Sequence, residues 1–173
     1  MDLTQIIRNV PDFPKEGIQF KDITTLLQHE GAFQYVINTW HERYDDQNID
    51  IIIGADARGF IFGGALAYAM GKPFSLVRKK GKLPHDTIAQ SYELEYGEDT
   101  LEMHTDALSK GDRILLIDDL LATGGTMEAT AKLVEQLGGD IVEMAFVVEL
   151  PPLKGRERLE KYSIHSLVEF MVD

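Results

Sequence analysis

Hydrophobic and polar positions along the chain form two repeating patterns, short apolar runs and longer stripes with helical spacing. Apolar runs typical of buried strands cover residues 49–53, 74–77, 114–117, 141–150 and 164–170. Helical stripes cover residues 33–44, 60–70 and 127–137. Because strands and helices alternate, we expect an α/β fold with a doubly wound, mostly parallel sheet flanked by helices.

The middle of the chain predicts an antiparallel excursion from this sheet. Residues 91–96 alternate in the manner of a strand, and a turn at Gly97 leads into a second strand at 100–103. Residues 79–86 before them are polar and contain glycine and proline, so we expect a mobile loop there. This hairpin and loop form the flexible part of the expected fold.

The N-terminal segment carries weaker signals. Residues 4–9 are expected to form a short helix. Residues 10–22 hold two prolines and a glycine, which predicts an ordered loop. The total of 173 residues suggests one domain that spans residues 1–173 and is long enough for a real core.

Composition narrows the classes of function. The formal net charge of −12 makes nucleic-acid binding unexpected, because a nucleic-acid surface needs clustered cations. The chain has no cysteine, which excludes disulfides and thiolate metal sites and fits a reducing compartment. No signal peptide is expected, and the longest mostly apolar stretch, residues 59–71, is too short to span a membrane. A basic cluster at 78–82 instead suggests a small anionic ligand.

The stretch DDLLATGGT, residues 118–126, carries the clearest chemical signal. It stands where the strand 114–117 gives way to a helix, the position at which α/β proteins bind ligands. Loop residues Ala122, Thr123, Gly124, Gly125 and Thr126 can close around a phosphate at the helix N-terminus, while the carboxylates of Asp118 and Asp119 can accept hydrogen bonds from ribose hydroxyls. One ligand, a ribose 5-phosphate, satisfies both halves. The alternative is a plain strand-to-helix connection with capping acids, and the pattern alone leaves both open.

DDLLATGGT resembles the signature that binds phosphoribosyl pyrophosphate (PRPP) in the type I phosphoribosyltransferase family, in the form found in its adenine-using branch. Five further blocks resemble that family in the same order: VPDFPKEGIQFKDITTLL, GADARGFIFG, RKKGKLP, SYELEYGEDTLEMHTDAL and ELPPLKGRERL, which together reach from Val10 to Leu159. The departures are mild. Glu16 and Thr25 stand where proline is expected, and Asp56 stands where many members have glutamate.

The resemblance implies a fold, a reaction and partners. It implies the type I phosphoribosyltransferase fold, with residues 1–30 as an N-terminal hood over the base and 31–173 as the core. The implied reaction joins adenine to PRPP with Mg²⁺ and gives AMP and pyrophosphate, in purine salvage. A cytoplasmic homodimer is implied as well. Mg²⁺ would arrive with PRPP, with no direct protein ligand, and the five histidines show no metal-ligand spacing.

The resemblance also assigns cations to the pyrophosphate. The tight loop of Ala57 and Arg58 would bind it, joined by Lys79 and Lys82 with Arg78 in support. Arginine suits this role because its planar fork can meet two phosphate oxygens. The alternatives are a surface ion pair between Arg58 and Asp56, and a solvated charged loop at 79–86 that can also close over the ligand.

The remaining assignments concern the base. By resemblance, Phe20 would stack on adenine while the backbone at Gln19 and Lys21 reads its amine edge, although an isolated aromatic such as Phe20 is more often an ordinary core residue. Leu150 would line the other face and Tyr96 would pack beside sugar and base. Glu95 would donate a proton to adenine N7, or act by orienting the base. Rival hypotheses are the same chemistry on an oxo purine and a PRPP-binding regulator of transcription.

Overall fold

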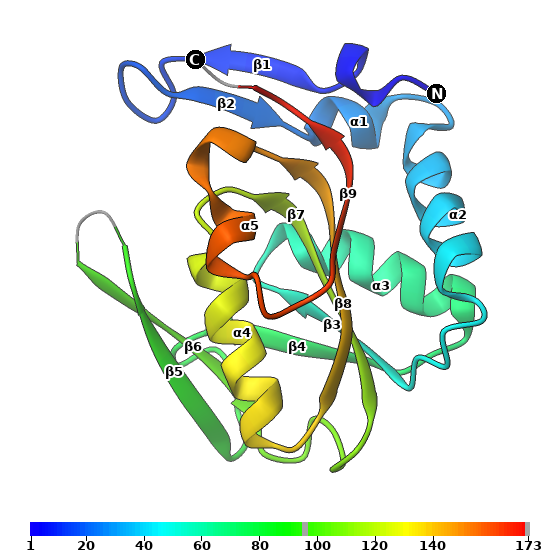
Figure 1. The fold of residues 1–173 in the computed structure, drawn as a ribbon, viewed down its shortest axis with the longest axis vertical. Coiled ribbons are helices and arrows are strands. Elements are labelled where there is room, and N and C mark those ends of the chain that lie inside the picture. Colours follow the sequence, from blue (N-terminus) through cyan, green and yellow to red (C-terminus); the bar gives the residue numbers. More distant parts are fainter. Residues whose placement is uncertain (95–96, 172–173) are drawn as a thin grey trace.

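The computed structural model describes residues 1–94 and 97–171, shown in Figure 1. Its strands are β1 (Arg8–Pro11), β2 (Gln19–Asp22), β3 (Ile51–Ala55), β4 (Phe74–Lys79), β5 (Thr87–Glu93), β6 (Glu98–His104), β7 (Arg113–Leu121), β8 (Asp140–Glu149) and β9 (Ile164–Glu169). Its α-helices are α1 (Thr24–Gln28), α2 (Ala32–Tyr44), α3 (Arg58–Met70), α4 (Gly125–Gln136) and α5 (Gly155–Arg158), and its 3₁₀ helices are η1 (Leu3–Gln5) and η2 (Pro151–Leu153).

The main sheet is mostly parallel, as expected. Its order in the described part of the chain is β5-β6-β4-β3-β7-β8-β9. All neighbours from β4 to β9 pair in parallel, whereas β6 pairs antiparallel with both β4 and β5. The α/β prediction and the antiparallel excursion are therefore confirmed. No helix within 1–94 and 97–171 has the length and apolar character needed to cross a membrane.

Two hydrophobic cores lie on the two faces of the sheet, and β7 contributes to both. Leu115 and Ile117 belong to the core under α2 and α3, whereas Ile114 and Leu116 belong to the core under α4. Successive side chains of a strand point to opposite faces, so this alternation is what a strand buried on both sides requires. The same alternation decides where the acids that follow Ile117 point.

The N-terminal prediction was wrong in its secondary structure. A 3₁₀ turn, η1, replaces the expected helix at 4–9, and the expected loop at 10–22 contains most of an antiparallel β1–β2 hairpin. The hairpin is held by side chains that sequence periodicity does not reveal, such as the Arg8–Asp22 ion pair. It lies across the end of the molecule toward which the arrowheads of β8 and β9 point (Figure 1).

Two strands near the expected site are longer than their apolar runs. β4 continues through Arg78 and Lys79 because these residues pair with Glu102 and Leu101 of β6. β7 continues through the two acids to Leu121, paired with β8. Lys79 is therefore fixed on a strand rather than carried by a loop, and the acids lie inside a strand rather than after it.

Candidate active site

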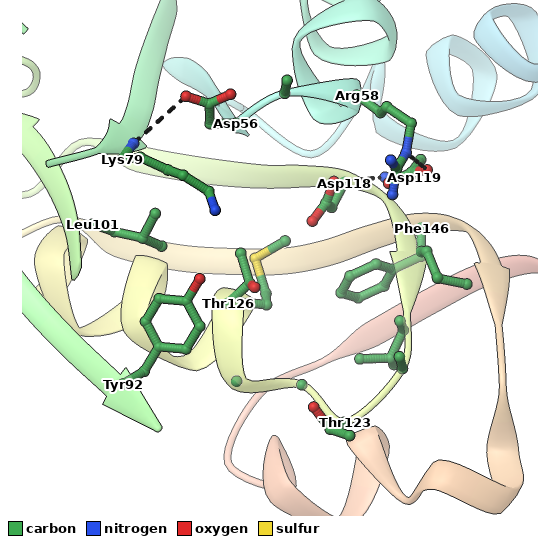
Figure 2. Close-up of a pocket in the computed structure, with 17 residues that line it drawn as sticks. Asp56, Arg58, Lys79, Tyr92, Leu101, Asp118, Asp119, Thr123, Thr126 and Phe146 are labelled. Carbon is green, nitrogen blue, oxygen red and sulfur yellow. Dashed lines mark hydrogen bonds and ion pairs between the residues drawn. The ribbon is translucent and has the colours of Figure 1, made fainter. Parts of the chain in front are cut away.

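A cleft of about 450 Å³ opens where β3 and β7 end. It is lined by residues 56–58 and 118–127 together with Lys79, Tyr92, Leu101 and Phe146. Figure 2 shows the side chains of Asp118, Lys79 and Tyr92 directed into the same space. The fold thus brings most of the predicted phosphate and pyrophosphate residues to one cavity at the carboxyl ends of parallel strands.

The loop 122–126 has the geometry of an anion cradle. Gly124 has a φ of +83°, which favours glycine, and α4 begins at the next residue, so backbone N–H groups at the helix N-terminus face the loop. The loop is braced from behind by α5. A side chain at Gly155 would collide with the carbonyl of Ala122 and with Leu121, so only glycine allows α5 to approach this closely. Sequence reasoning did not identify this role for Gly155.

Asp118 and Asp119 point to different surroundings because they are neighbours on one strand. Asp119 is 4% exposed and accepts a hydrogen bond of 2.5 Å from Arg58 Nε. Asp118 accepts a hydrogen bond of 2.9 Å from the backbone N–H of Asp119 but forms no ion pair within the described residues. Burial, followed by the nearby charge of Asp119, raises the pKa of Asp118 well above its ordinary value.

Arg58 is placed by the close approach of α3 to β7. A Cβ at Gly59 would lie 2.8 Å from the carbonyl oxygen of Ile117 and 3.1 Å from Asp118 Oδ1, so glycine at this position allows the helix N-terminus to pack against the acids. Burial opposes the charge of Arg58, but the attraction of Asp119 outweighs it and raises the pKa of Arg58. The alternative ion pair between Arg58 and Asp56 is not formed.

The other predicted pyrophosphate residues are only partly brought together. Ala57 and Lys79 line the cleft, and the peptide bond between Asp56 and Ala57 is cis. Arg78 lies outside the lining, where its Nε donates to Asp56 Oδ2 at 3.2 Å. Lys82 is exposed in the β4–β5 connection and also lies outside the cleft.

The predicted base residues lie beside the cleft rather than in its lining. The ring of Phe20 is 5.9 Å from the Arg58 guanidinium carbon and packs edge-on against Phe13. The side chains of Gln19 and Lys21 both form hydrogen bonds with the side chain of Asn9. Leu150 is buried directly after the end of β8. The predicted residues Glu95 and Tyr96 lie outside the described residues.

Tyr92 is a lining residue that sequence reasoning missed. It stands on β5 directly opposite Asp99 of β6, and its hydroxyl lies 3.4 Å from Asp99 Oδ2. Burial raises the pKa of this phenol, and the side chain of Thr126 offsets part of the rise. The alternation of residues 91–96 could have placed Tyr92 on one face of the hairpin, but only the pairing of β6 with β4 turns that face toward the cleft. The described residues contain no group of three or more histidine or acidic side chains arranged to hold a metal ion.

Comparison with known proteins agrees with this geometry. Residues 22–172 match the family model described as the phosphoribosyl transferase domain. Adenine phosphoribosyltransferase of Clostridium tetani is 55% identical, over 98% of this chain and 99% of that protein. The crystal structure of adenine phosphoribosyltransferase from Thermoanaerobacter pseudethanolicus superposes with a TM-score of 0.94 at 50% identity, covering 97% of this chain and 98% of that one.

A more distant relative was solved with ligands. The Saccharomyces cerevisiae adenine phosphoribosyltransferase, complexed with an imino-altritol bisphosphate and adenine, is 39% identical with a TM-score of 0.91, covering 96% of both chains. Identity of this extent over nearly the whole length, joined to the same fold, leaves no doubt of kinship. The chain belongs to the phosphoribosyltransferase family, among the adenine phosphoribosyltransferases.

Proposed function

We propose that this chain transfers the 5-phosphoribosyl group from PRPP to adenine, which gives AMP and pyrophosphate and serves purine salvage. The observation that carries the proposal is the composition of the cleft at the ends of β3 and β7. It joins a phosphate cradle, a carboxylate without a cation partner among the described residues, and the cations Arg58 and Lys79. These groups match the parts of PRPP one by one.

The 5-phosphate of PRPP would bind at the cradle, residues 122–126. Backbone N–H groups and the partial positive charge of the α4 N-terminus would attract the phosphate, and the hydroxyls of Thr123 and Thr126 would add hydrogen-bond donors. The ribose hydroxyls would donate to Asp118 and Asp119. Asp118 is the more available acceptor because Arg58 already engages Asp119. A ligand that donates hydrogen bonds to the Asp118 carboxylate would favour its ionised form.

The pyrophosphate would leave from the opposite end of the ribose. The bond between C1 and the pyrophosphate oxygen breaks while the bond from adenine N9 to C1 forms on the other face, and adenine loses one proton. Arg58 and Lys79, which line the cleft, would stabilise the charge that develops on the leaving oxygens, and Arg78 and Lys82 would support them. Positioning of the two substrates in one cleft supplies the rest of the rate.

Adenine would bind between the hood and the core. Residues 1–30 form the hood, in which Phe20 would stack on the base and the backbone at Gln19 and Lys21 would read its amine edge. The distance of 5.9 Å between the Phe20 ring and the Arg58 guanidinium carbon supports this placement next to the cleft. Leu150, Tyr96 and the proton donor Glu95 complete the proposed base site.

Magnesium fits this site because the Asp118 carboxylate has no cation partner within the described residues, and Mg²⁺ prefers carboxylate, phosphate and water oxygens. The ion would enter with PRPP, and Asp118 and Asp119 would hold it through water. When bound, it neutralises part of the charge on the pyrophosphate oxygens.

A cytoplasmic homodimer is the proposed assembly and location, from membership of this family. One surface that suits self-association is the outer face of α3, where Ile61 and Tyr68 are 41% and 91% exposed and stand two helical turns apart.

Turnover with PRPP and Mg²⁺ tests the proposal, with adenine, hypoxanthine, guanine and xanthine offered in parallel and pyrophosphate release measured. We expect activity with adenine alone. Activity with an oxo purine would retain the cradle but overturn the base site. PRPP binding without turnover of any base, together with DNA binding at low salt, would favour the regulatory function instead.

A further inference from the structure

Lys79 reaches the cleft but is already engaged by an acid from the neighbouring hairpin. Its Nζ lies 2.9 Å from Oδ2 of Asp99, whose side chain is 23% exposed. Asp99 also lies 3.4 Å from the hydroxyl of Tyr92. The interactions with Lys79, the backbone N–H of Thr100 and Tyr92 lower the pKa of Asp99, so it is a carboxylate at neutral pH.

Strand register explains why these three side chains meet. Lys79 of β4 stands opposite Leu101 of β6, so the two share a face of the sheet. Asp99 is two residues from Leu101 and therefore lies on the same face, diagonal to Lys79 and within reach of its long side chain. Tyr92 of β5 stands directly opposite Asp99. The face that carries all three is the one that lines the cleft.

Asp99 differs from the other acids that engage the cations of this site. Asp119 is buried and pairs with Arg58. Asp56 lines the cleft, pairs with Arg78 and lies 3.5 Å from the backbone nitrogen of Lys79, not from its ammonium group. Asp99 lies on β6 of the β5–β6 hairpin, and the atom of Lys79 with which it pairs is the terminal Nζ. Pyrophosphate oxygens could take its place at Nζ without any movement of the main sheet.

We propose that Asp99 is a positioning residue that holds Lys79 in the free enzyme and competes with pyrophosphate oxygens for its ammonium group. The inference rests on the proposed function of the cleft. PRPP must displace Asp99 from Lys79 to gain that cation, and Asp99 recovers it when pyrophosphate leaves. Asp99 therefore weakens the binding of PRPP and of pyrophosphate in the same direction, and it favours product release.

The expected effect is modest because Lys79 is 57% exposed. Ion pairs at such positions change an equilibrium by up to about fivefold and weaken as salt screens them. Asp99→Asn should lower KM for PRPP by about two- to fivefold and strengthen product inhibition by pyrophosphate by a similar factor. KM for adenine should stay unchanged, and the effect should shrink as ionic strength rises.

The experiment compares initial rates of wild type, Asp99→Asn, Asp99→Glu and a control, with PRPP varied at saturating adenine and Mg²⁺. The control is Asp140→Asn, which makes the same change of charge at the N-terminal end of β8, where the exposed Asp140 pairs with Arg113. Wild-type kinetics are expected for Asp140→Asn and, because it keeps the carboxylate, for Asp99→Glu. Thermal unfolding of each variant checks the fold.

A double-mutant cycle with Lys79→Gln isolates the pair. In the Lys79→Gln background, Asp99→Asn should leave KM for PRPP unchanged. An unchanged or raised KM in the single variant Asp99→Asn would overturn the inference, as would the same decrease in both backgrounds. Failure of the wild type to turn over adenine would instead reject the proposed function, so the two failures are distinguishable.

Discussion

Two carboxylates in this molecule, Glu143 and Asp118, have pKa values that are shifted in opposite directions by their surroundings. The Glu143 cluster consists of Glu143 of β8, Arg43 and Tyr44 of α2, and Ser163, and it holds α2 against the sheet. Burial alone would raise the pKa of Glu143, but the hydrogen bonds from Arg43, Tyr44 and Ser163 lower it to about 2. In the cleft, by contrast, the pKa of Asp118 is raised, by burial and by Asp119.

The difference separates a stabilising cluster from a binding one. Glu143 accepts four hydrogen bonds, from Arg43 Nε at 2.8 Å, Arg43 Nη2 at 3.0 Å, the Tyr44 hydroxyl at 2.6 Å and the Ser163 hydroxyl at 2.8 Å. Asp118 accepts one backbone bond and pairs with no cation in the described parts of the chain. A buried charge that is fully paired specifies the fold, whereas one left unpaired has a cost that a ligand can relieve. Changes in the first cluster should alter stability, and changes in the second should alter catalysis.

The largest expected effect is on catalysis, from Arg58→Gln. The change removes a cation from the developing charge of pyrophosphate, and the loss of one such group typically lowers kcat by about 10²- to 10³-fold. We expect a drop of that order in kcat/KM for PRPP. Arg58→Lys should recover part of it, because lysine keeps the charge but not the planar fork.

Arg113→Gln is the matched control for this measurement. Arg113 begins β7 at the end of the strand opposite the cleft, and its side chain is 41% exposed against 48% for Arg58. Its contacts are carbonyl groups of the connection before β3 and Asp140. Equal losses in the two variants would show that Arg58 acts on the fold rather than on the substrate.

The next effect is on stability, from Arg43→Ala. The change leaves Glu143 buried without its cation, which costs about 3 kcal/mol or more for a fully buried pair. Because Arg43 is itself 43% exposed, we expect a loss of about 2–3 kcal/mol in the free energy of unfolding. Urea denaturation at pH 7 and fixed protomer concentration measures it, while kcat of the folded protein should be retained.

Lys161→Ala provides the comparison. Lys161 forms an ion pair with Glu135 at 2.6 Å, but its side chain is 68% exposed, so its removal should cost much less than that of Arg43. If Arg43→Ala costs no more than Lys161→Ala, the Glu143 cluster does not stabilise the fold in the way its burial indicates.

The same two clusters show what sequence reasoning can reach. The strand 114–117, the helix after it and the loop 122–126 are consecutive, so local pattern places the acids and the cradle together. Arg43 and Glu143 are 100 residues apart, and nothing local links them. That pair follows only from the docking of α2 on the sheet. Tyr92 and Asp99 were missed for the same reason, because strand register decides which face of the hairpin meets the cleft.

Strand lengths were underestimated where charge interrupts an apolar run. The predicted strands 74–77 and 114–117 stop before the cations at 78–79 and the acids at 118–119, since polar residues usually end a buried strand. In the structure they are the strand positions that face or flank the cleft. Charged residues at the ends of these apolar strands therefore mark the candidate site. This agrees with the expectation that predictions of secondary structure from local sequence fail most often at functional sites.

The smallest expected effect is a gain in stability, from Asp118→Asn. Asparagine keeps the acceptor for the Asp119 N–H but removes a carboxyl group that the fold holds at a raised pKa, so the ligand-free protein should gain about 0.5–2 kcal/mol at pH 7. Binding of PRPP should weaken at the same time, because the ribose loses a carboxylate acceptor. Thermal unfolding and a PRPP titration measure the two effects on one sample.

The dependence of this gain on pH tests its cause. The pKa of Asp118 is higher in the folded than in the unfolded chain, so its ionisation destabilises the fold as pH rises from the unfolded value of 3.8 through the folded value. The advantage of Asp118→Asn over wild type should therefore be small near pH 4 and grow as pH increases. A gain that is independent of pH would trace to packing rather than to charge. A loss of stability at pH 7 would mean that Asp118 is already satisfied in the free enzyme, and the contrast with Glu143 would fail.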